Sequence, residues 1–184
     1  MAISNYAFQA RRWNNRHDDL QTLTGLYGSW SGTTFIGDSC PSGFLANKGD
    51  GIPAGGFYFT TASDGSDTLY ACDPTDIQRV SVGDNLYAVG VETLGLIAPA
   101  DRRAPFTEIK KGETYAFGVS NFSTLVDASN PVATVSDGLL VGASELDSSF
   151  AGWYFEIDKE MGIDAFIEAN YVAGSRYNLV AKYI

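Results

Sequence analysis

Residues 176–184 have the sequence "RYNLVAKYI", in which apolar and polar side chains alternate along the segment. One face of this segment would carry Tyr177, Leu179, Ala181 and Tyr183. The opposite face would carry Asn178, Val180 and Lys182. This period of two predicts a strand with one face on a core. The preceding Gly-Ser step is typical of a hairpin turn, so the C-terminus is predicted to be the closing strand of a sheet.

Seven further runs rich in β-branched and aromatic residues lie between clusters of Gly, Asp, Ser, Asn and Pro. These runs are residues 56–61, 68–72, 86–91, 114–119, 138–142, 153–157 and 166–172. The turn-forming clusters recur about every 8–15 residues, and no helical period alternates with the strands. Such a pattern predicts an all-β fold, a single β-barrel or β-sandwich domain.

Two segments resemble each other: residues 80–91, "VSVGDNLYAVGV", and residues 108–119, "EIKKGETYAFGV". Each has a Gly followed by an acidic residue and then a Tyr-Ala-x-Gly-Val strand. Two hairpins with similar turns would explain the likeness, and this interpretation is favoured. Duplicated halves of a barrel remain the alternative.

The aromatic runs at residues 57–59 and 153–155 place large side chains on both faces of their strands. Apolar residues on both faces predict burial on both sides. The favoured explanation is that other parts of the same chain cover the second face of these strands. The alternatives are that another subunit contacts this face or that its rings form a platform for a bound sugar.

The chain has 184 residues with 22 acidic and 12 basic side chains, giving a net charge of −10. This length predicts one domain, or one domain with an arm. A body of this charge repels phosphate, so we expect no direct nucleic-acid binding. No apolar run approaches the roughly 20 residues that span a bilayer, so we expect no membrane contact. The N-terminal residues do not resemble a secretion signal, which predicts synthesis in a cytoplasm.

The N-terminus carries the basic segment "QARRWNNRHDD", residues 9–19. The first 17 residues contain three arginines and no acid, which leaves −13 for the rest of the chain. We therefore divide the chain into an N-terminal arm, residues 1–25, and an all-β domain, residues 26–184. The arm is predicted to become helical or extended against a partner. The alternatives are a free terminus and packing on its own domain.

The inventory for catalysis is small. The only histidine, His17, lies in the predicted arm, and no Gly-x-Ser-x-Gly elbow occurs. Cys40 and Cys72 are too few and too far apart in sequence for a zinc site, and two free thiols are favoured over a disulfide. Glu156 and Glu168 are the best candidates for a glycosidase pair, but outward-facing strand positions explain them more simply. We predict no catalytic residues, no metal and no cofactor.

Three glycine- or acid-rich segments are predicted to be surface loops and turns. Residues 46–56, "ANKGDGIPAGG", do not match the Gly-x4-Gly-Lys-[Ser/Thr] pattern of a phosphate-binding loop, and Asp50 stands where phosphate would need a positive charge. Residues 37–40 and 64–67 offer carboxylates but not the converging oxygens that calcium needs.

Residues 82–119, 135–144 and 171–184 together resemble, in their general style, the small structural proteins of tailed-bacteriophage heads. The resemblance is carried by "VGDNLYAVGVETLGLIAPADRRAPFTEIKKGETYAFGV", "VSDGLLVGAS" and "YVAGSRYNLVAKYI". The family is that of the decoration (cement) or auxiliary capsid proteins. It implies a β-barrel or β-tulip-like domain without catalytic residues, often a trimer.

The resemblance also implies a function: a virion structural protein, made in the host cytoplasm, that binds the capsid surface and stabilises contacts between neighbouring subunits. Its partners would be the major capsid protein or other virion subunits, and further copies in a homo-oligomer, with a trimer favoured. The predicted partner-binding residues are Arg11, Arg12, Trp13 and Arg16, which would dock on an acidic groove of a neighbour. The alternative function is a carbohydrate- or receptor-binding β-sandwich module on a particle surface.

Overall fold

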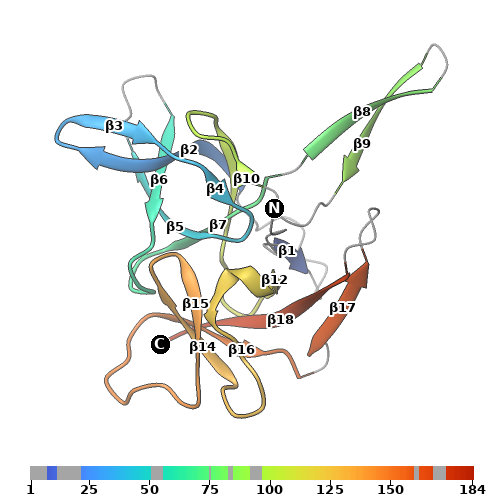
Figure 1. Ribbon diagram of the computed structural model, residues 1–184. Coiled ribbons are helices and arrows are strands. Elements are labelled where there is room, and N and C mark those ends of the chain that lie inside the picture. Colours follow the sequence, from blue (N-terminus) through green and yellow to red (C-terminus); the bar gives the residue numbers. More distant parts are fainter. Residues whose placement is uncertain are drawn as a thin grey trace.

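The computed structural model describes residues 8–11, 22–50, 56–74, 76–82, 85–91, 97–159, 162–167 and 173–184 (Figure 1). These residues form strands, turns and one short 3-10 helix, η1 (Val119–Asn121), without an α-helix. The predicted all-β fold class is therefore confirmed. Within the same residues no helix is long and apolar enough to cross a bilayer.

Five strands form a closed barrel. They are β2 (Thr22–Ser31), β5 (Leu45–Asp50), β6 (Phe57–Thr61), β7 (Leu69–Cys72) and β11 (Ala104–Glu108). Their order is β11-β7-β5-β6-β2, and β11 also pairs with β2, which closes the ring. Strand β3 (Thr34–Gly37) pairs with β2 and continues the sheet outside the barrel.

A second, curled sheet lies beside the barrel, in the lower half of Figure 1. Its strands are β1 (Phe8–Arg11), β12 (Thr114–Gly118), β13 (Phe122–Thr124), β14 (Val132–Ser136), β15 (Leu139–Ala143), β16 (Trp153–Ile157), β17 (Ile163–Ile167) and β18 (Ala173–Tyr183). Two small two-stranded sheets complete the fold. One joins β4 (Cys40–Pro41) to β10 (Ile97–Ala98), and the other joins β8 (Asp76–Val82) to β9 (Asn85–Val91).

The alternation predicted for the C-terminus is present in β18, which pairs with β12, β16 and β17. Tyr177, Leu179 and Ala181 are buried as expected. Asn178, predicted on the outer face, is fully buried, and it makes hydrogen bonds with Asp158 and Gly162. Its backbone N and its side-chain Nδ2 both donate to the Gly162 carbonyl oxygen, each at a distance of 3.0 Å.

The barrel and the curled sheet share one core. Leu45 and Leu69 of the barrel belong to the same buried cluster as Tyr115, Phe117 and Phe155 of the curled sheet. A second cluster fills the barrel itself, where the rings of Phe59 and Phe106 stack. The shared cluster makes the two sheets one structural unit.

The predicted boundary of the arm at residue 25 differs from the structure in two places. Residues 8–11 form β1, which pairs with β12, and residues 22–25 begin β2 in the barrel. The reason at β1 is that Phe8 is buried and its ring packs on Tyr115 and Phe117. The segment therefore becomes extended against its own sheet and does not need another molecule to do so.

The loop predicted over residues 46–56 is also wrong in its first half. Residues 45–50 form β5 inside the barrel, and Leu45 and Ala46 are fully buried. Gly49 does not mark a turn: a Cβ there would clash with the ring of Tyr58 on β6. The glycine lets that ring lie against the β5 backbone.

Candidate functional site

The most exposed apolar surface of the barrel lies on the hairpin that β2 and β3 form. Trp30 and Phe35 face each other across this hairpin, which turns at Gly32 with a φ of +62°. Their rings pack at 5.4 Å, and both pack on Tyr58, at 5.2 and 5.4 Å. Ile36 lies on the opposite face of the hairpin, because successive strand residues alternate. We call Trp30, Phe35, Ile36 and Tyr58 the hairpin surface.

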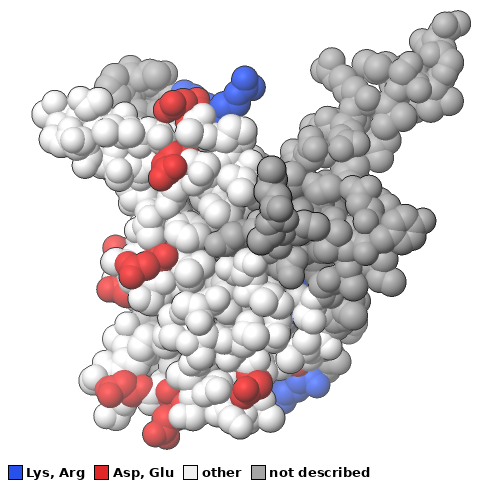
Figure 2. Space-filling view, viewed as in Figure 1, with Lys and Arg blue, Asp and Glu red and all other residues white. Residues whose placement is uncertain are grey.

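The hairpin surface carries no charge. Residues 28–37 have the sequence "GSWSGTTFIG", without a charged side chain. Trp30 is 40% exposed and Ile36 is 54% exposed. In Figure 2 the projecting end of this hairpin, at the upper left, shows neither blue nor red atoms. Exposed tryptophan beside aliphatic residues is typical of protein contact sites.

The ring geometry bears on the kind of ligand that fits. The Trp30 ring meets Phe35 at 70° and Tyr58 at 83°, and Phe35 meets Tyr58 at 49°. These edge-to-face contacts stabilise the rings against each other. They do not form the coplanar ring platform that the carbohydrate-binding alternative calls for.

A second projecting feature is the ribbon of β8 and β9, which extends away from the body at the upper right of Figure 1. Its two strands pair over seven positions, from Asp76 opposite Val91 to Val82 opposite Asn85. Among the described strands, β8 and β9 pair only with each other. The ribbon is therefore a sheet of two strands, separate from the two large sheets.

The predicted hairpin at residues 80–91 is confirmed by this ribbon. The second segment, residues 108–119, is not a hairpin, because β11 and β12 lie in different sheets. Its Tyr115 and Phe117 are fully buried in the shared core. The related Tyr-Ala-Val-Gly pattern on β9 thus lies in a strand that belongs to neither of the two large sheets.

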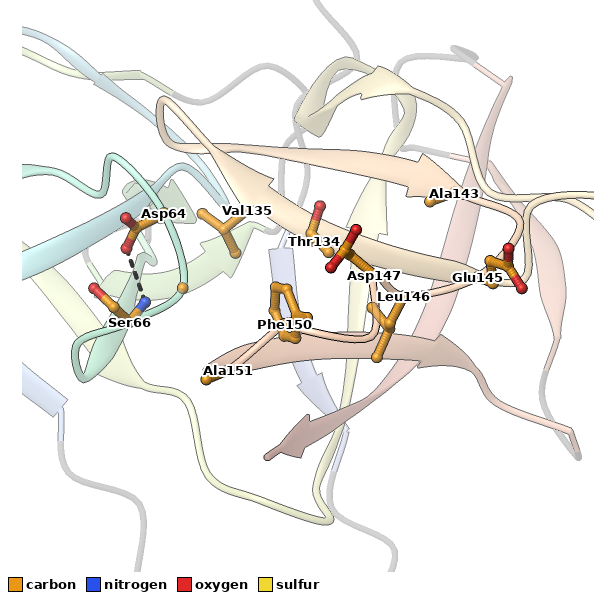
Figure 3. A pocket seen from close by; sticks show the side chains of 11 residues that line it. Asp64, Ser66, Thr134, Val135, Ala143, Glu145, Leu146, Asp147, Phe150 and Ala151 are labelled. Carbon is orange, nitrogen blue, oxygen red and sulfur yellow. Dashed lines mark hydrogen bonds between the residues drawn. The ribbon is translucent and has the colours of Figure 1, made fainter.

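One pocket of about 470 Å³ opens between the turn after β6 and the loop from β15 to β16 (Figure 3). Phe150, Leu146 and Val135 supply apolar lining, and Asp64, Glu145 and Asp147 supply carboxylates. Figure 3 shows the Asp64 carboxylate turned back onto its own loop, where Oδ1 accepts from the Ser66 backbone N at 2.9 Å.

Both aspartates of this pocket are held in the ionised form. Hydrogen bonds from the side chain and backbone of Ser66 lower the pKa of Asp64. Ser149 lowers the pKa of Asp147 in the same way. The predicted turn at residues 64–67 is confirmed, and the Asp64 carboxylate serves its geometry.

The other candidate chemistry does not assemble within the described residues. They contain no group of three or more His, Cys, Asp or Glu side chains that is placed to hold a metal ion. Glu156 lies 3.7 Å from the Lys182 ammonium and is 40% exposed. Glu168 and His17 lie outside the described residues.

Cys40 and Cys72 are free thiols, both fully buried at the edge of the barrel core. The Cys72 thiol donates to the Cys40 carbonyl oxygen at 3.6 Å. Burial, followed by the neighbouring Cys72, raises the pKa of the Cys40 thiol far above its usual value. Because the thiolate is the reactive form, we expect the buried Cys40 to react slowly in the folded protein.

We expect both thiols to resist a water-soluble disulfide reagent in the native protein and to react once it is unfolded.

Since the pKa of the Cys40 thiol is raised on folding, Cys40 loses its thiol proton in the unfolded chain first as the pH rises. The free energy of unfolding should therefore fall above about pH 8.5, by up to ~1.4 kcal/mol per pH unit. The slope is measured by denaturing the wild-type protein and the Cys40→Ala variant at several pH values from about 8 to 9.5 and comparing how their free energies of unfolding change. An equal slope in the variant would contradict the assignment.

Of the four predicted partner-binding residues, the structure describes only Arg11. Arg11 ends β1, where its backbone lies opposite Thr114 of β12. Arg12, Trp13 and Arg16 lie outside the described residues. The structure therefore fixes where this basic segment starts, at the edge of the curled sheet.

The fold and these surfaces define an all-β protein with a closed barrel, a curled second sheet and two projecting hairpins. Comparison of the chain with protein-family models, with curated proteins and with solved structures finds no match.

Proposed function

We propose that this protein is a non-enzymatic structural protein of a virus particle, which binds the capsid surface and stabilises contacts between neighbouring capsid subunits. The observation that carries the proposal is the β8–β9 ribbon. A hairpin of two strands is marginally stable in water unless something packs against it. Among the described strands, those of the ribbon pair only with each other, so we propose that a second molecule covers it.

The identity of that second molecule comes from the resemblance to phage-head proteins. We propose the major capsid protein or another virion subunit as the partner, and the virion as the place of action after synthesis in a host cytoplasm. The net charge of −10 supports this proposal, because acidic outer surfaces keep a large particle soluble. Acidic side chains are spread over the face shown in Figure 2.

The basic segment is the second part of the proposal. Arg11, Arg12 and Arg16 would make charge-assisted hydrogen bonds to acidic groups of a neighbouring subunit, and Trp13 would fill a pocket there. Arg11 ends β1, which is the last described strand at its end of the curled sheet, so this residue lies at a sheet edge. The segment needs no regular structure of its own to bind in this way.

The alternative, a carbohydrate- or receptor-binding module, has less support. A sugar stacks on an open ring face, and the rings of the hairpin surface cover each other edge to face. The described pocket offers ionised carboxylates and one aromatic ring, Phe150, which is itself packed on Tyr154 at 6.1 Å.

The ribbon can be removed without touching the barrel. Asp76 and Val91 are direct partners, so replacing residues 77–90 by an Asn-Gly turn should leave the rest of the chain in place. We expect the melting temperature to change by less than about 4 °C. Binding to purified capsids of the virus that encodes the chain, measured by cosedimentation, should weaken at least about tenfold.

A charge-reversal variant, Arg12→Glu with Arg16→Glu, tests the basic segment in the same assay. Its binding should weaken and should lose its dependence on salt. Unchanged binding by both variants would contradict the proposed function. Binding of the wild-type protein to glycans and not to capsids would favour the alternative.

A further inference from the structure

The hairpin surface is apolar on both faces and lies at an open sheet edge. Trp30 is 40% exposed on one face, and Ile36 is 54% exposed on the other. Strand β3 ends its sheet: one edge pairs with β2, and no other described strand pairs with its second edge. The backbone groups along that second edge are therefore available to another strand.

This edge lacks the features that normally keep two sheets apart. Natural edge strands carry charges, proline or bulges that block pairing with another chain. Residues 31–37, "SGTTFIG", contain neither a charge nor a proline, and the ladder between β2 and β3 is regular from Gly28 to Ser31. A short, uncharged, apolar edge of this kind favours a strand of another molecule.

Charge decides which molecule fits. The whole chain carries −10, and a basic partner would be drawn to its acidic faces rather than to a neutral hairpin. Two copies of this chain repel each other wherever acidic faces meet. Charges separated by more than about 8 Å are screened at physiological salt, so only groups close to a contact matter. The neutral hairpin is thus a place where two equally acidic copies can meet with little repulsion.

Two described carboxylates, those of Asp38 and Asp101, lie at the base of the hairpin. Asp38 follows β3, and its carboxylate accepts from the Ser39 backbone N at 2.7 Å. The side chain of Asp101 lies so close to Gly37 that a Cβ there would clash with it. These groups limit pairing to the part of β3 nearer its turn, which includes Thr34, Phe35 and Ile36.

We propose that two copies of this chain associate through β3, by antiparallel pairing of the two free edges about a two-fold axis. An antiparallel pair of identical strands is self-complementary, which is the form that a two-fold contact requires. The pairing joins the two barrel sheets and places the partner strand beside Phe35 and Ile36 of β3. It goes beyond the proposed function and puts a two-fold contact in place of the trimer that the resemblance favours. It needs no capsid and is tested without one.

The test is the solution mass of the full chain, measured by sedimentation over a range of concentrations. We expect a reversible dimer that changes little between about 0.05 and 0.5 M NaCl, since no charge lies in the contact. Ile36→Lys places two unpaired charges in it and should weaken the dimer at least about tenfold. Thr34→Lys acts on the same edge from an exposed position and provides a second, independent variant.

Ile163→Lys is the matched control. Ile163 is 50% exposed, close to the value for Ile36, but it lies on β17 of the curled sheet. This control should dimerise like the wild type. A wild-type monomer, a trimer, a dimer that salt dissociates, or a dimer that survives both hairpin variants would each overturn the proposal. Loss of the dimer in Ile163→Lys as well would also overturn it.

Discussion

Truncating Phe59 to alanine is expected to lower the free energy of unfolding by about 3–5 kcal/mol, the usual range for a buried phenylalanine. Phe59 is fully buried inside the closed barrel. Its ring stacks on Phe106 with centroids 3.9 Å apart and planes 12° apart, and it meets the edge of Tyr70 at 5.4 Å. A ring of five paired strands cannot easily collapse onto a cavity, so little of the loss should be recovered.

The control for this prediction lies two residues away on the same strand. Phe57 is half-buried, and its ring lies 4.4 Å from the Lys48 ammonium. Phe57→Ala should lower the free energy of unfolding by less than about 2 kcal/mol, because its ring remains partly in water. Denaturant titration of both variants, followed by tryptophan fluorescence, gives the comparison. Equal losses would show that the stacked pair is not the centre of the barrel core.

The sequence predicted best those strands whose side chains alternate around aromatic residues. Residues 153–157 match β16 at both ends, and β18 contains the predicted strand up to residue 183. Strands β2 and β5 escaped prediction because they contain glycines, which the sequence analysis took as turn signals. Gly25 lies where a Cβ would clash with the Phe59 ring, so its role is close approach. That role depends on a partner strand more than 30 positions away.

The candidate surfaces were harder to predict from the sequence than the strands. The neutral stretch at residues 28–37 is visible in the sequence, but the exposure of Ile36 depends on β3 being the last strand of its sheet. The hairpin at residues 80–91 was predicted, whereas its separation from both sheets was not. Strand order is set by long-range pairing, and a local pattern of residues does not determine it.

The same limit explains β1, whose partner β12 lies about 100 positions further along the chain. The basic side chains of residues 9–19 pointed to an arm, because charge is a local signal. Phe8, just before them, carries the tertiary information, since its ring packs on both Tyr115 and Phe117. An arm and an edge strand thus overlap in one short segment.

Phe8→Ala should release β1 from the curled sheet. Its ring stacks on Tyr115 at 5.8 Å and packs on Phe117 at 5.4 Å, and β1 has no other described strand beyond β12. We expect the free energy of unfolding to fall by about 3 kcal/mol, at the lower end for phenylalanine because an edge strand can detach. Hydrogen exchange of the β12 amides that face β1 should speed up by at least about tenfold, while β16 is unaffected.

Phe8→Leu is the matched variant, since it keeps most of the apolar volume and should retain slow exchange. Unchanged exchange in Phe8→Ala would show that pairing alone, without the ring, holds β1 in place.

The outcome also decides how the basic segment is tested. Deleting residues 1–20 would remove β1 together with Arg12, Trp13 and Arg16, and so would mix lost stability with lost binding. Substitutions that spare Phe8 separate the two effects.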